Sequence, residues 1–419
     1  RCRFGCGFGG GGVLRGAVGQ LQRLVLDADL AHQGQQLVGV QGHVGELHAG
    51  ARVGEQLERE VAQLAAELPK DRVVAVDVPS GVQGDDGNPL GDVCFEAALT
   101  VTFVRKKPAH VLMPGRAWCG EVVVADIGAP ESIVVAQKVA LRENDPSLWL
   151  LPWPEADAHK HERGHVIVAS GGHTRTGAAR LSARAAARAG AGLVTVLSPN
   201  DALAENAAQL TAIMLREGED EVSFAEAARA AQSIVIGPAF GTSDAHYKLL
   251  LAATNAQPRC PLVLDADAIT LLAPMTHGLD ASDVMTPHLG EFRRAFPGIW
   301  SNSTHPVDAA RAAAAYARCV VLLKGPSTVI AAPDGRAIVN TTGSPFLATA
   351  GSGDVLAGLI AGLIAQGMPS FEAASAGAWI HGRAGEAFGP GLTADDLPDI
   401  LPRIFNALAP SALRRKPIG

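Results

Sequence analysis

From Arg72 onward, short apolar runs alternate with polar or glycine-rich turns. Three such runs lie in "RVVAVDVPSG", "AALTVTFVRKKP" and "GEVVVADIGAP", and further ones lie in "GHVIVASGG", "GLVTVLS", "SIVIGPAFG", "PLVLDADAITLL" and "VVLLKGPSTVIAAPDG". Runs that are apolar throughout predict strands buried on both faces. Because segments of helical period alternate with these strands, the pattern predicts an α/β fold with a mostly parallel sheet covered by helices on both faces.

A helix is predicted after the turn "GSGD" at 351–354. Large residues recur there in pairs four positions apart, and small residues fill the gaps, in "VLAGLIAGLI". This period is helical, and Gly367 and Pro369 would end the helix. The N–H groups and the positive dipole end of its first turn predict an anion-binding site. Asp354 is then either a helix cap or a catalytic group, and the tetrad alone favours neither.

The pattern divides the chain into four parts. Residues 1–54 are rich in Gly, Gln and His and have no strand or helix period, which predicts a poorly ordered segment. Residues 55–135 form a partial α/β domain that begins with a predicted helix at 55–68. Residues 136–158 contain three prolines and are interpreted as a linker, and residues 159–410 form a second α/β domain.

Composition narrows the class of protein. The 419 residues are 47% hydrophobic and 18% charged, which favours a packed core, and a net charge of −7 argues against nucleic-acid binding. The six cysteines include no C-x-x-C pair, so neither a zinc site nor a disulfide framework is indicated, and a cytoplasmic location is expected. The apolar runs are too short to cross a membrane, so no membrane partner is expected.

Several polar residues follow predicted strands, where ligands of such sheets bind. The "DAD" sequence ends one strand, and only one of its two carboxylates, Asp265 or Asp267, needs to face a site. "TPHLGEF" presents His288 as a candidate ligand contact or as an ordinary surface histidine. Lys324 ends "VVLL" and could place its charge on a phosphate.

In this order the motifs resemble the carbohydrate-kinase-like domain of NAD(P)H-hydrate dehydratases. The resemblance runs from residue 159 to 404 and includes "TGAARLSARAAARAGAGLVTV", "IGPAFG", "LDADA", "TPHLGEF", "KGPSTV", "LATAGSGDVLAG" and "WIHGRAGE". It implies a ribokinase-like, doubly wound sheet. The family usually has G-P-G-x-G and T-P-H-P-G-E, so Ala239 and Leu289 change loop shape without removing a polar group.

The resemblance implies dehydration of (S)-NADHX and (S)-NADPHX to NADH and NADPH. ADP is the co-substrate in bacterial members and ATP in others, with Mg²⁺, and a homo-oligomer is expected. Asp354 would be the general base. The implied substrate contacts are Ala178, Gly241, His288 and Asp354, and the implied nucleotide contacts are Lys324, Gly325, Pro326, Ser327, Thr328 and Gly353.

Residues 72–130 resemble instead the second half of the Rossmann-like NAD(P)H-hydrate epimerase domain. By this resemblance Asp77 contacts the substrate and Ser80 binds K⁺. The family's Asn-Asn-Gly-Gly-Asp phosphate loop does not occur in residues 1–68. We therefore expect epimerase activity to be lost or incomplete.

Two alternative functions are considered. A small-molecule kinase of the same fold could also use the "GSGD" turn, although the full set of motifs argues against it. A nucleotide-binding module without catalysis would be favoured by Ala or Asn at position 354, where the chain has Asp.

Overall fold

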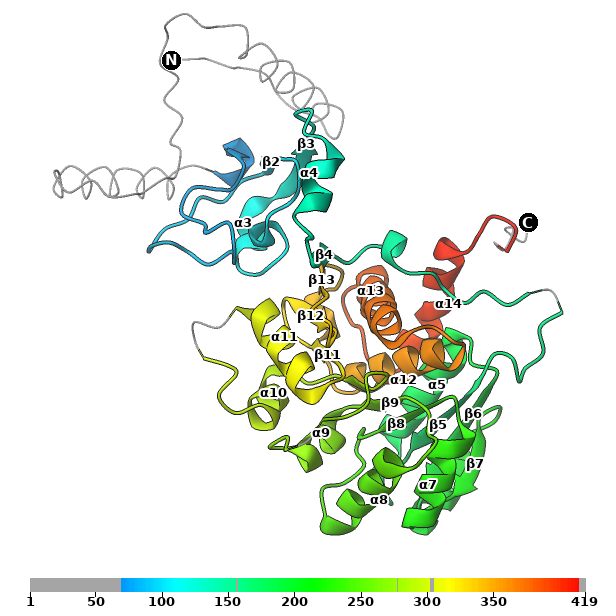
Figure 1. Cartoon of the computed structure of the whole chain (residues 1–419). Coiled ribbons are helices and arrows are strands. Elements are labelled where there is room, and N and C mark those ends of the chain that lie inside the picture. Colours follow the sequence, from blue (N-terminus) through cyan, green and yellow to red (C-terminus); the bar gives the residue numbers. More distant parts are fainter. Residues whose placement is uncertain (1–68, 156, 277, 302–304, 414–419) are drawn as a thin grey trace, which may run out of the picture. The chain divides into compact units, whose positions relative to one another are not determined.

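The computed structural model describes residues 69–155, 157–276, 278–301 and 305–413. These residues form two compact units, divided after Pro130, except that residues 111–113 group with the larger unit (Figure 1). The predicted disordered segment 1–54 and the predicted helix at 55–68 lie outside the described residues.

The smaller unit contains the three predicted strands, β1 (Val74–Val76), β2 (Leu99–Phe103) and β3 (Glu121–Ala125). They form a parallel sheet in the order β1-β2-β3, and the short helix α3 (Gly115–Cys119) lies between β2 and β3 in the chain. The prediction of a fully buried first strand is wrong, because Val74 is 51% and Val76 63% exposed. Among residues 69–130 β1 is an edge strand, and these three strands alone supply no second layer to cover it.

The larger unit contains a ten-stranded sheet in the order β4-β13-β12-β11-β10-β9-β8-β5-β6-β7. Every neighbouring pair is parallel except those of β12 with β11 and β13, so the predicted mostly parallel sheet is confirmed. The strands are β4 (Leu141–Glu143), β5 (His165–Ala169), β6 (Leu193–Ser198), β7 (Met214–Glu217), β8 (Ser233–Ile236), β9 (Leu262–Leu264), β10 (Val284–Met285), β11 (Val320–Leu323), β12 (Thr328–Ala331) and β13 (Ala337–Asn340). The edge strand β4 comes from the segment interpreted as a linker.

Helices cover both faces of this sheet (Figure 1). Side chains alternate between the two cores along each strand; Ile234 packs in one core and Val235 in the other. One core takes α7 (Glu221–Ala230), α8 (Asp244–Asn255), α9 (Ala266–Leu272), α10 (Leu289–Ala295) and α11 (Pro306–Ala317). The other takes α5 (Gly177–Ala189), α12 (Ser352–Ala365), α13 (Ser370–Phe388) and α14 (Leu397–Leu408). The unit also contains α4 (Glu131–Ala136) and α6 (Leu203–Gln209).

Helices α5 and α12 pack in close contact along the small-residue stripe of α12. A Cβ atom at Gly358 would lie 2.0 Å from the carbonyl oxygen of Ser182, and one at Gly362 would lie 2.7 Å from that of Ala186. Glycine at these positions lets the two backbones approach. The predicted helix and its close-packing stripe are therefore confirmed.

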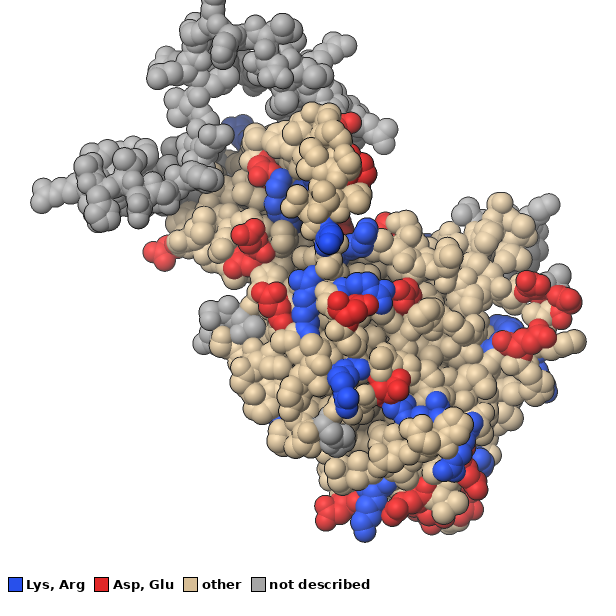
Figure 2. All heavy atoms as spheres, viewed as in Figure 1, with Lys and Arg blue, Asp and Glu red and all other residues tan. Residues whose placement is uncertain are grey.

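The charged side chains show no separation by sign on the face drawn in Figure 2. Basic and acidic side chains lie beside one another across the larger unit. Among the described residues, no helix has the length and apolar character needed to cross a membrane.

Candidate active site

The ends of β9, β10 and β11 bring a buried ion pair to one edge of the large sheet. Lys324, directly after β11, places its Nζ 2.7 Å from Oδ1 of Asp265, directly after β9. Thr286, after β10, donates its hydroxyl to the same carboxylate oxygen at 2.8 Å. Because Asp265 is only 2% exposed, these two donors compensate a carboxylate that is removed from water.

The first turn of α12 faces this ion pair. Its N-cap residue is Gly351, whose φ of 88° favours glycine. A Cβ atom at Gly353 would lie 3.2 Å from Nζ of Lys324 and 3.5 Å from Oδ2 of Asp265, so both charges lie against the helix backbone. No side chain among the described residues caps α12. The amide of Ser352 donates to the carbonyl of Thr349 at 3.3 Å, and the N–H groups of Gly353 and Asp354 stay available to an anion.

Asp354 lies in this first turn but does not cap the helix. The structure therefore argues against the helix-cap alternative. Burial, and then repulsion from Asp265, raise the pKa of Asp354 to about 7, although Lys324 acts in the opposite direction. A carboxyl group with this pKa can accept a proton near neutral pH, as a general base must.

Buried groups of two other helices fix the start of α12. The hydroxyl of Ser182 in α5 donates to the carbonyl oxygen of Asp354 at 2.7 Å. Nε2 of His381 in α13 lies 3.0 Å from the carbonyl oxygen of Ser352 and 3.1 Å from its hydroxyl. Burial lowers the pKa of His381 to about 4, so this histidine is neutral at physiological pH. No role for His381 is predicted from the sequence, although the motif "WIHGRAGE" that contains it is part of the resemblance to the dehydratases.

His288 lies beside Lys324, to which it is joined by a parallel β-bridge. It is the N-cap of α10: its Nδ1 accepts from the amide of Gly290 at 2.9 Å, and its own amide donates to Glu291 at 2.8 Å. Nε2 lies 3.3 Å from the other Glu291 carboxylate oxygen. The ring is 55% exposed and stays accessible to a ligand.

Both aspartates of the "DAD" sequence make contacts at this edge of the sheet, whereas the sequence predicted that only one of them needs to face a site. The strand ends at Leu264 and α9 starts at Ala266, so the alternation of a continuing strand does not apply. Asp267 accepts from the amide of Gly241 at 2.9 Å and thereby fixes the "GPAFG" loop. In that loop Ala239 has a φ of 51°, a conformation that favours glycine.

The other predicted nucleotide contacts form the turn between β11 and β12 and the first residue of β12, Thr328. Gly325 and Pro326 are exposed, Ser327 and Thr328 are half-buried, and the Thr328 hydroxyl donates to the Gly325 carbonyl at 3.0 Å. Ala178 lies in the first turn of α5, the helix that packs along α12. Lys324 thus lies beside His288, Gly353 and Asp265, whereas Ala178 is connected to this group through the packing of α5 along α12.

In the smaller unit, Asp77 follows β1 with a φ of 69°. Its carboxylate pairs with Lys107 and accepts from Thr102 at 2.8 Å. Burial raises the pKa of Asp77, but the hydrogen bonds from Lys107 and Thr102 outweigh it and hold the pKa below its ordinary value. Ser80 is exposed, and its carbonyl accepts from the amide of Phe95 at 3.0 Å.

Comparison with known proteins matches both units. The sequence pattern described as NAD(P)H-hydrate dehydratase matches residues 166–403, more than half of the chain. The chain belongs to this family. The pattern described as YjeF-related protein N-terminus matches residues 39–109. The resemblances found in the sequence are therefore confirmed, and so is the prediction of an enzyme of the dehydratase class.

Relatives and solved structures agree with this family. The bifunctional NAD(P)H-hydrate repair enzyme of Moorella thermoacetica is 38% identical over 361 residues, which cover 80% of this chain and 67% of that protein. The enzyme of that name from Coxiella burnetii is 36% identical over 368 residues, covering 84% and 74%. The chain thus spans about two thirds to three quarters of the length of these two relatives.

The ribokinase-like fold is confirmed by crystal structures. A ribokinase-like superfamily protein of Enterococcus faecalis superposes with a TM-score of 0.59 at 25% identity, covering 64% of this chain and 97% of that one. The ADP/ATP-dependent NAD(P)H-hydrate dehydratase of Bacillus subtilis, co-crystallized with ATP/Mg²⁺, superposes with a TM-score of 0.55 at 29% identity, covering 62% and 95%.

Proposed function

We propose that the larger unit dehydrates (S)-NADHX and (S)-NADPHX with ADP or ATP as phosphoryl donor. The observation that carries this proposal is the Asp354 carboxyl group, with its pKa near 7, in the uncapped first turn of α12. A proton acceptor beside an anion-binding turn is suited to phosphoryl transfer onto a hydroxyl group. Membership of the dehydratase family supports the same reaction.

In the proposed reaction the hydroxyl oxygen of the substrate attacks the terminal phosphorus of the nucleotide, and Asp354 takes the proton of that hydroxyl. The bond from that phosphorus to the leaving nucleotide breaks, and the N–H groups of 351–353 stabilise the transferring phosphoryl group. Phosphate then leaves the carbon as the ring nitrogen supplies an electron pair, and loss of a proton from the neighbouring carbon restores the double bond. Hydroxide, a poor leaving group, is thus replaced by phosphate.

The proposed nucleotide contacts are Lys324 to Thr328 together with Gly353. Lys324 fits this role because its Nζ lies against the first turn of α12, where the terminal phosphate would be bound. Ala178, Gly241, His288 and Asp354 are the proposed contacts to the hydrated coenzyme. His288 fits because its ring is exposed beside Lys324.

Mg²⁺ is expected to enter with the nucleotide. The described residues contain no group of three or more His, Cys, Asp or Glu side chains that could hold a metal ion. Mg²⁺ commonly binds substrate phosphates and water with few protein ligands, so this proposal routes no step through a protein metal site. When bound, Mg²⁺ would offset negative charge on the phosphates.

For the smaller unit we propose only a partial epimerase site, with Asp77 contacting the substrate and Ser80 binding K⁺. The sequence contains no identifiable phosphate loop that would complete a site with these two residues. We expect that the chain does not accelerate interconversion of the R and S forms. Chromatography that resolves the epimers in R-enriched NADHX checks this; enzyme-accelerated loss of the R form would contradict it.

The dehydratase proposal is tested by supplying (S)-NADHX with ADP or ATP and Mg²⁺. We expect one NADH, seen by its absorbance, and one phosphate per nucleotide consumed. A phosphorylated product without recovery of NADH would instead identify a small-molecule kinase. Binding of nucleotide without turnover would identify a non-catalytic module.

A further inference from the structure

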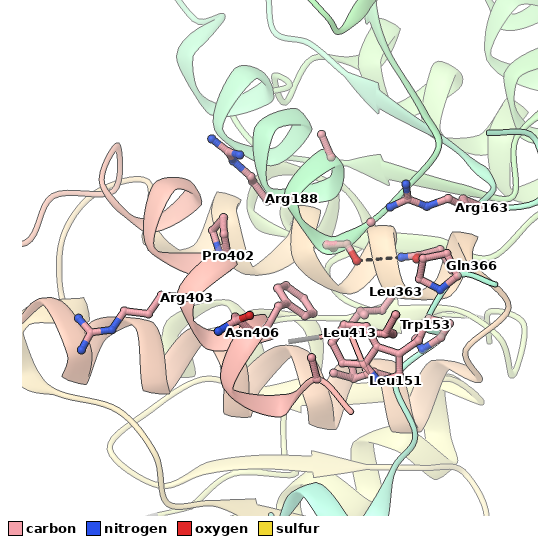
Figure 3. A pocket seen from close by; sticks show the side chains of 17 residues that line it. Leu151, Trp153, Arg163, Arg188, Leu363, Gln366, Pro402, Arg403, Asn406 and Leu413 are labelled. Carbon is pink, nitrogen blue, oxygen red and sulfur yellow. Dashed lines mark hydrogen bonds between the residues drawn. The ribbon is translucent and has the colours of Figure 1, made fainter. Parts of the chain in front are cut away.

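Helices α5 and α12 run from the candidate active site to a pocket of about 620 Å³ at their other end (Figure 3). Leu151, Trp153 and Leu363 line the apolar centre of this pocket, and the amide nitrogen of Gln366 in its wall already donates to two backbone carbonyls. Among the described residues that line it, no group indicates a particular class of ligand. Groups that do indicate a ligand lie in the loops that follow β5 and β8.

The order of the strands in the large sheet reverses between β5 and β8. From β5 the chain continues to β6 and β7, and it then returns to the other side of β5 to form β8, β9 and β10. The helix after β5, α5, packs in the core on one face of the sheet, and the helix after β8, α8, packs in the core on the other. Ligands of such sheets bind between the two loops at this switch point.

The two loops at the switch point contact each other. A Cβ atom at Gly171, after β5, would lie 2.2 Å from the carbonyl oxygen of Ala239, after β8, and 3.0 Å from the Cβ atom of Arg175. The loop after β5 is fixed by Glu205, whose carboxylate accepts from the amide of Thr174 at 3.0 Å. The side chain of Arg175 therefore begins beside the "GPAFG" loop.

Arg175 is available to bind an anion. It is exposed and has no ion pair or side-chain hydrogen bond among the described residues. Arg180, in the first turn of α5, differs because its charge lies close to Glu205, whereas the charge of Arg175 lies close to His246. Guanidinium groups bind phosphate through paired N–H donors, so a phosphate is the anion that suits Arg175.

His246, in the first turn of α8, faces the same point from the other loop. Its Nε2 lies 2.7 Å from the position that a Cβ atom at Gly241 would take, so the ring lies directly against this glycine. Nδ1 is engaged by the hydroxyl of Ser243 at 2.6 Å, and the ring packs edge-on against Phe240, with centroids 5.1 Å apart. The ring is thus held in place, and Nε2 is the nitrogen left for a ligand.

The spacing of the strands indicates which phosphate would bind there. The reacting hydroxyl is proposed to bind beside Asp354, in a helical turn that lies against Asp265 at the end of β9. β8 and β5 are the next two strands beyond β9, about 5 and 10 Å away. In the hydrated coenzyme a single ribose separates the ring from the diphosphate, which fits this short separation. The 2′-phosphate of NADPHX lies on the far side of the diphosphate.

We propose that Arg175 and His246 bind the diphosphate of the hydrated coenzyme at the switch point between β5 and β8. Arg175 would donate to it through its guanidinium group and His246 through Nε2. Ala178 and Gly241, two of the proposed substrate contacts, follow the same two strands and lie next to these residues in the chain. The inference rests on the proposed function and adds to it the residues that recognise the charged part of the substrate.

Titration of the full chain with NADH, NADPH and ADP with Mg²⁺ tests this proposal, with NADH and NADPH followed by fluorescence and ADP by calorimetry. Arg175→Gln should weaken binding of NADH and of NADPH about tenfold each, because it removes a charged phosphate contact, and should leave the Kd of ADP within about twofold. Arg175→Lys keeps the charge, so its Kd for NADH should stay within about threefold of that of the unmodified chain. His246→Gln should weaken NADH binding about fivefold.

Arg229→Gln is the control for loss of a positive charge. Arg229 is exposed in the last turn of α7, which precedes β8 and so lies at the opposite end of that strand from His246. This variant should change none of the three Kd values by more than about twofold.

An unchanged Kd for NADH in Arg175→Gln would overturn the proposal, and so would failure of NADH to bind the unmodified chain at millimolar concentration. A loss for NADPH alone would assign Arg175 to the 2′-phosphate, and an equal loss for ADP would assign it to the nucleotide site; each would overturn the proposal as well. If Arg175→Gln weakens NADH binding as expected but the unmodified chain does not convert NADHX, the diphosphate site is supported and the proposed dehydration is contradicted. If Arg175→Gln converts NADHX with an unchanged KM, the dehydration is supported and the diphosphate site is contradicted.

Discussion

Asp77 and Asp354 each lie near a lysine, and their pKa values are shifted in opposite directions from the ordinary value. Asp77 in the smaller unit pairs with Lys107 directly, which holds its pKa low despite burial. Asp354 in the larger unit has Lys324 nearby, but that lysine is paired with Asp265. Burial and the charge of Asp265 therefore raise the pKa of Asp354 to about 7. At Asp77 the hydrogen bonds from Lys107 and Thr102 outweigh burial, whereas at Asp354 burial and the charge of Asp265 outweigh the effect of Lys324.

The largest expected effect is that of Asp354→Asn, which removes the proton acceptor. We expect the rate of dehydration to fall about 100-fold or more, the usual scale for a general base, while nucleotide binding stays close to normal. Steady-state kinetics and calorimetry measure the two quantities. Asp334→Asn, at an exposed position in the turn after β12, is the control. Near-normal turnover in Asp354→Asn would show that the two aspartates do not differ in the way proposed.

Lys324→Ala should weaken binding of ADP or ATP about tenfold and binding of NADHX less. The reason is that Nζ lies against the first turn of α12, where phosphate is proposed to bind. Removing the lysine also leaves the buried Asp265 carboxylate unpaired, which destabilises the fold. Lys324→Ala combined with Asp265→Asn separates binding from folding, because it removes both charges. Equal losses of affinity for nucleotide and for NADHX would show that Lys324 is not a nucleotide contact.

The pH profile tests why Asp354 differs from Asp77. Dehydration should increase as pH rises through about 7, because Asp354 acts as a carboxylate. Asp265→Asn removes the repelling charge and frees Lys324, so the acidic limb of the profile should move about one unit to lower pH. Asp267→Asn should leave the limb in place, because the raised pKa of Asp354 is caused by burial and Asp265. A limb that does not move in Asp265→Asn would exclude Asp265 as the cause.

The same pKa predicts a stability effect. A carboxyl group whose pKa is raised on folding stabilises the fold below its unfolded pKa, and this contribution is lost as pH rises through the folded pKa of about 7. Asp354→Asn, which never ionises, should therefore have a higher Tm than the unmodified chain at pH 8 and the same Tm near pH 4. Thermal melts at both pH values check this. An equal Tm at pH 8 would show that the ionised Asp354 carries no cost.

The smallest expected effect concerns the loop that Asp267 fixes. Ala239 has a φ of 51°, so Ala239→Gly should stabilise the chain by about 0.5–1 kcal/mol against urea. Ala252→Gly in the interior of α8 is the matched control and should destabilise by about 1 kcal/mol. A destabilised Ala239→Gly variant would show that the loop gains more from the methyl group than it loses in backbone strain.

The sequence by itself determined the elements that depend on neighbours in the chain. The strands β5, β6, β8, β9, β11 and β12, the helix after "GSGD" and its small-residue stripe follow from apolar period and from turn residues, which act over a few positions. The order of the motifs indicated the family. Burial of Val74 and Val76 could not be read in the same way, because it depends on what packs against the edge strand β1.

Only the tertiary structure decided the chemistry of the site. Asp265 and Lys324 are 59 positions apart and meet because β9 and β11 flank β10 in the sheet. Burial, and then the charge of Asp265, raise the pKa of Asp354, and the pairing of Lys324 with Asp265 leaves Asp354 without a lysine of its own. Asp265 enters the ion pair with Lys324 and Asp267 fixes the "GPAFG" loop, because β9 ends at Leu264 and the alternation of a continuing strand does not apply. A pKa reports charges and burial summed over distant segments, and no local pattern contains that sum.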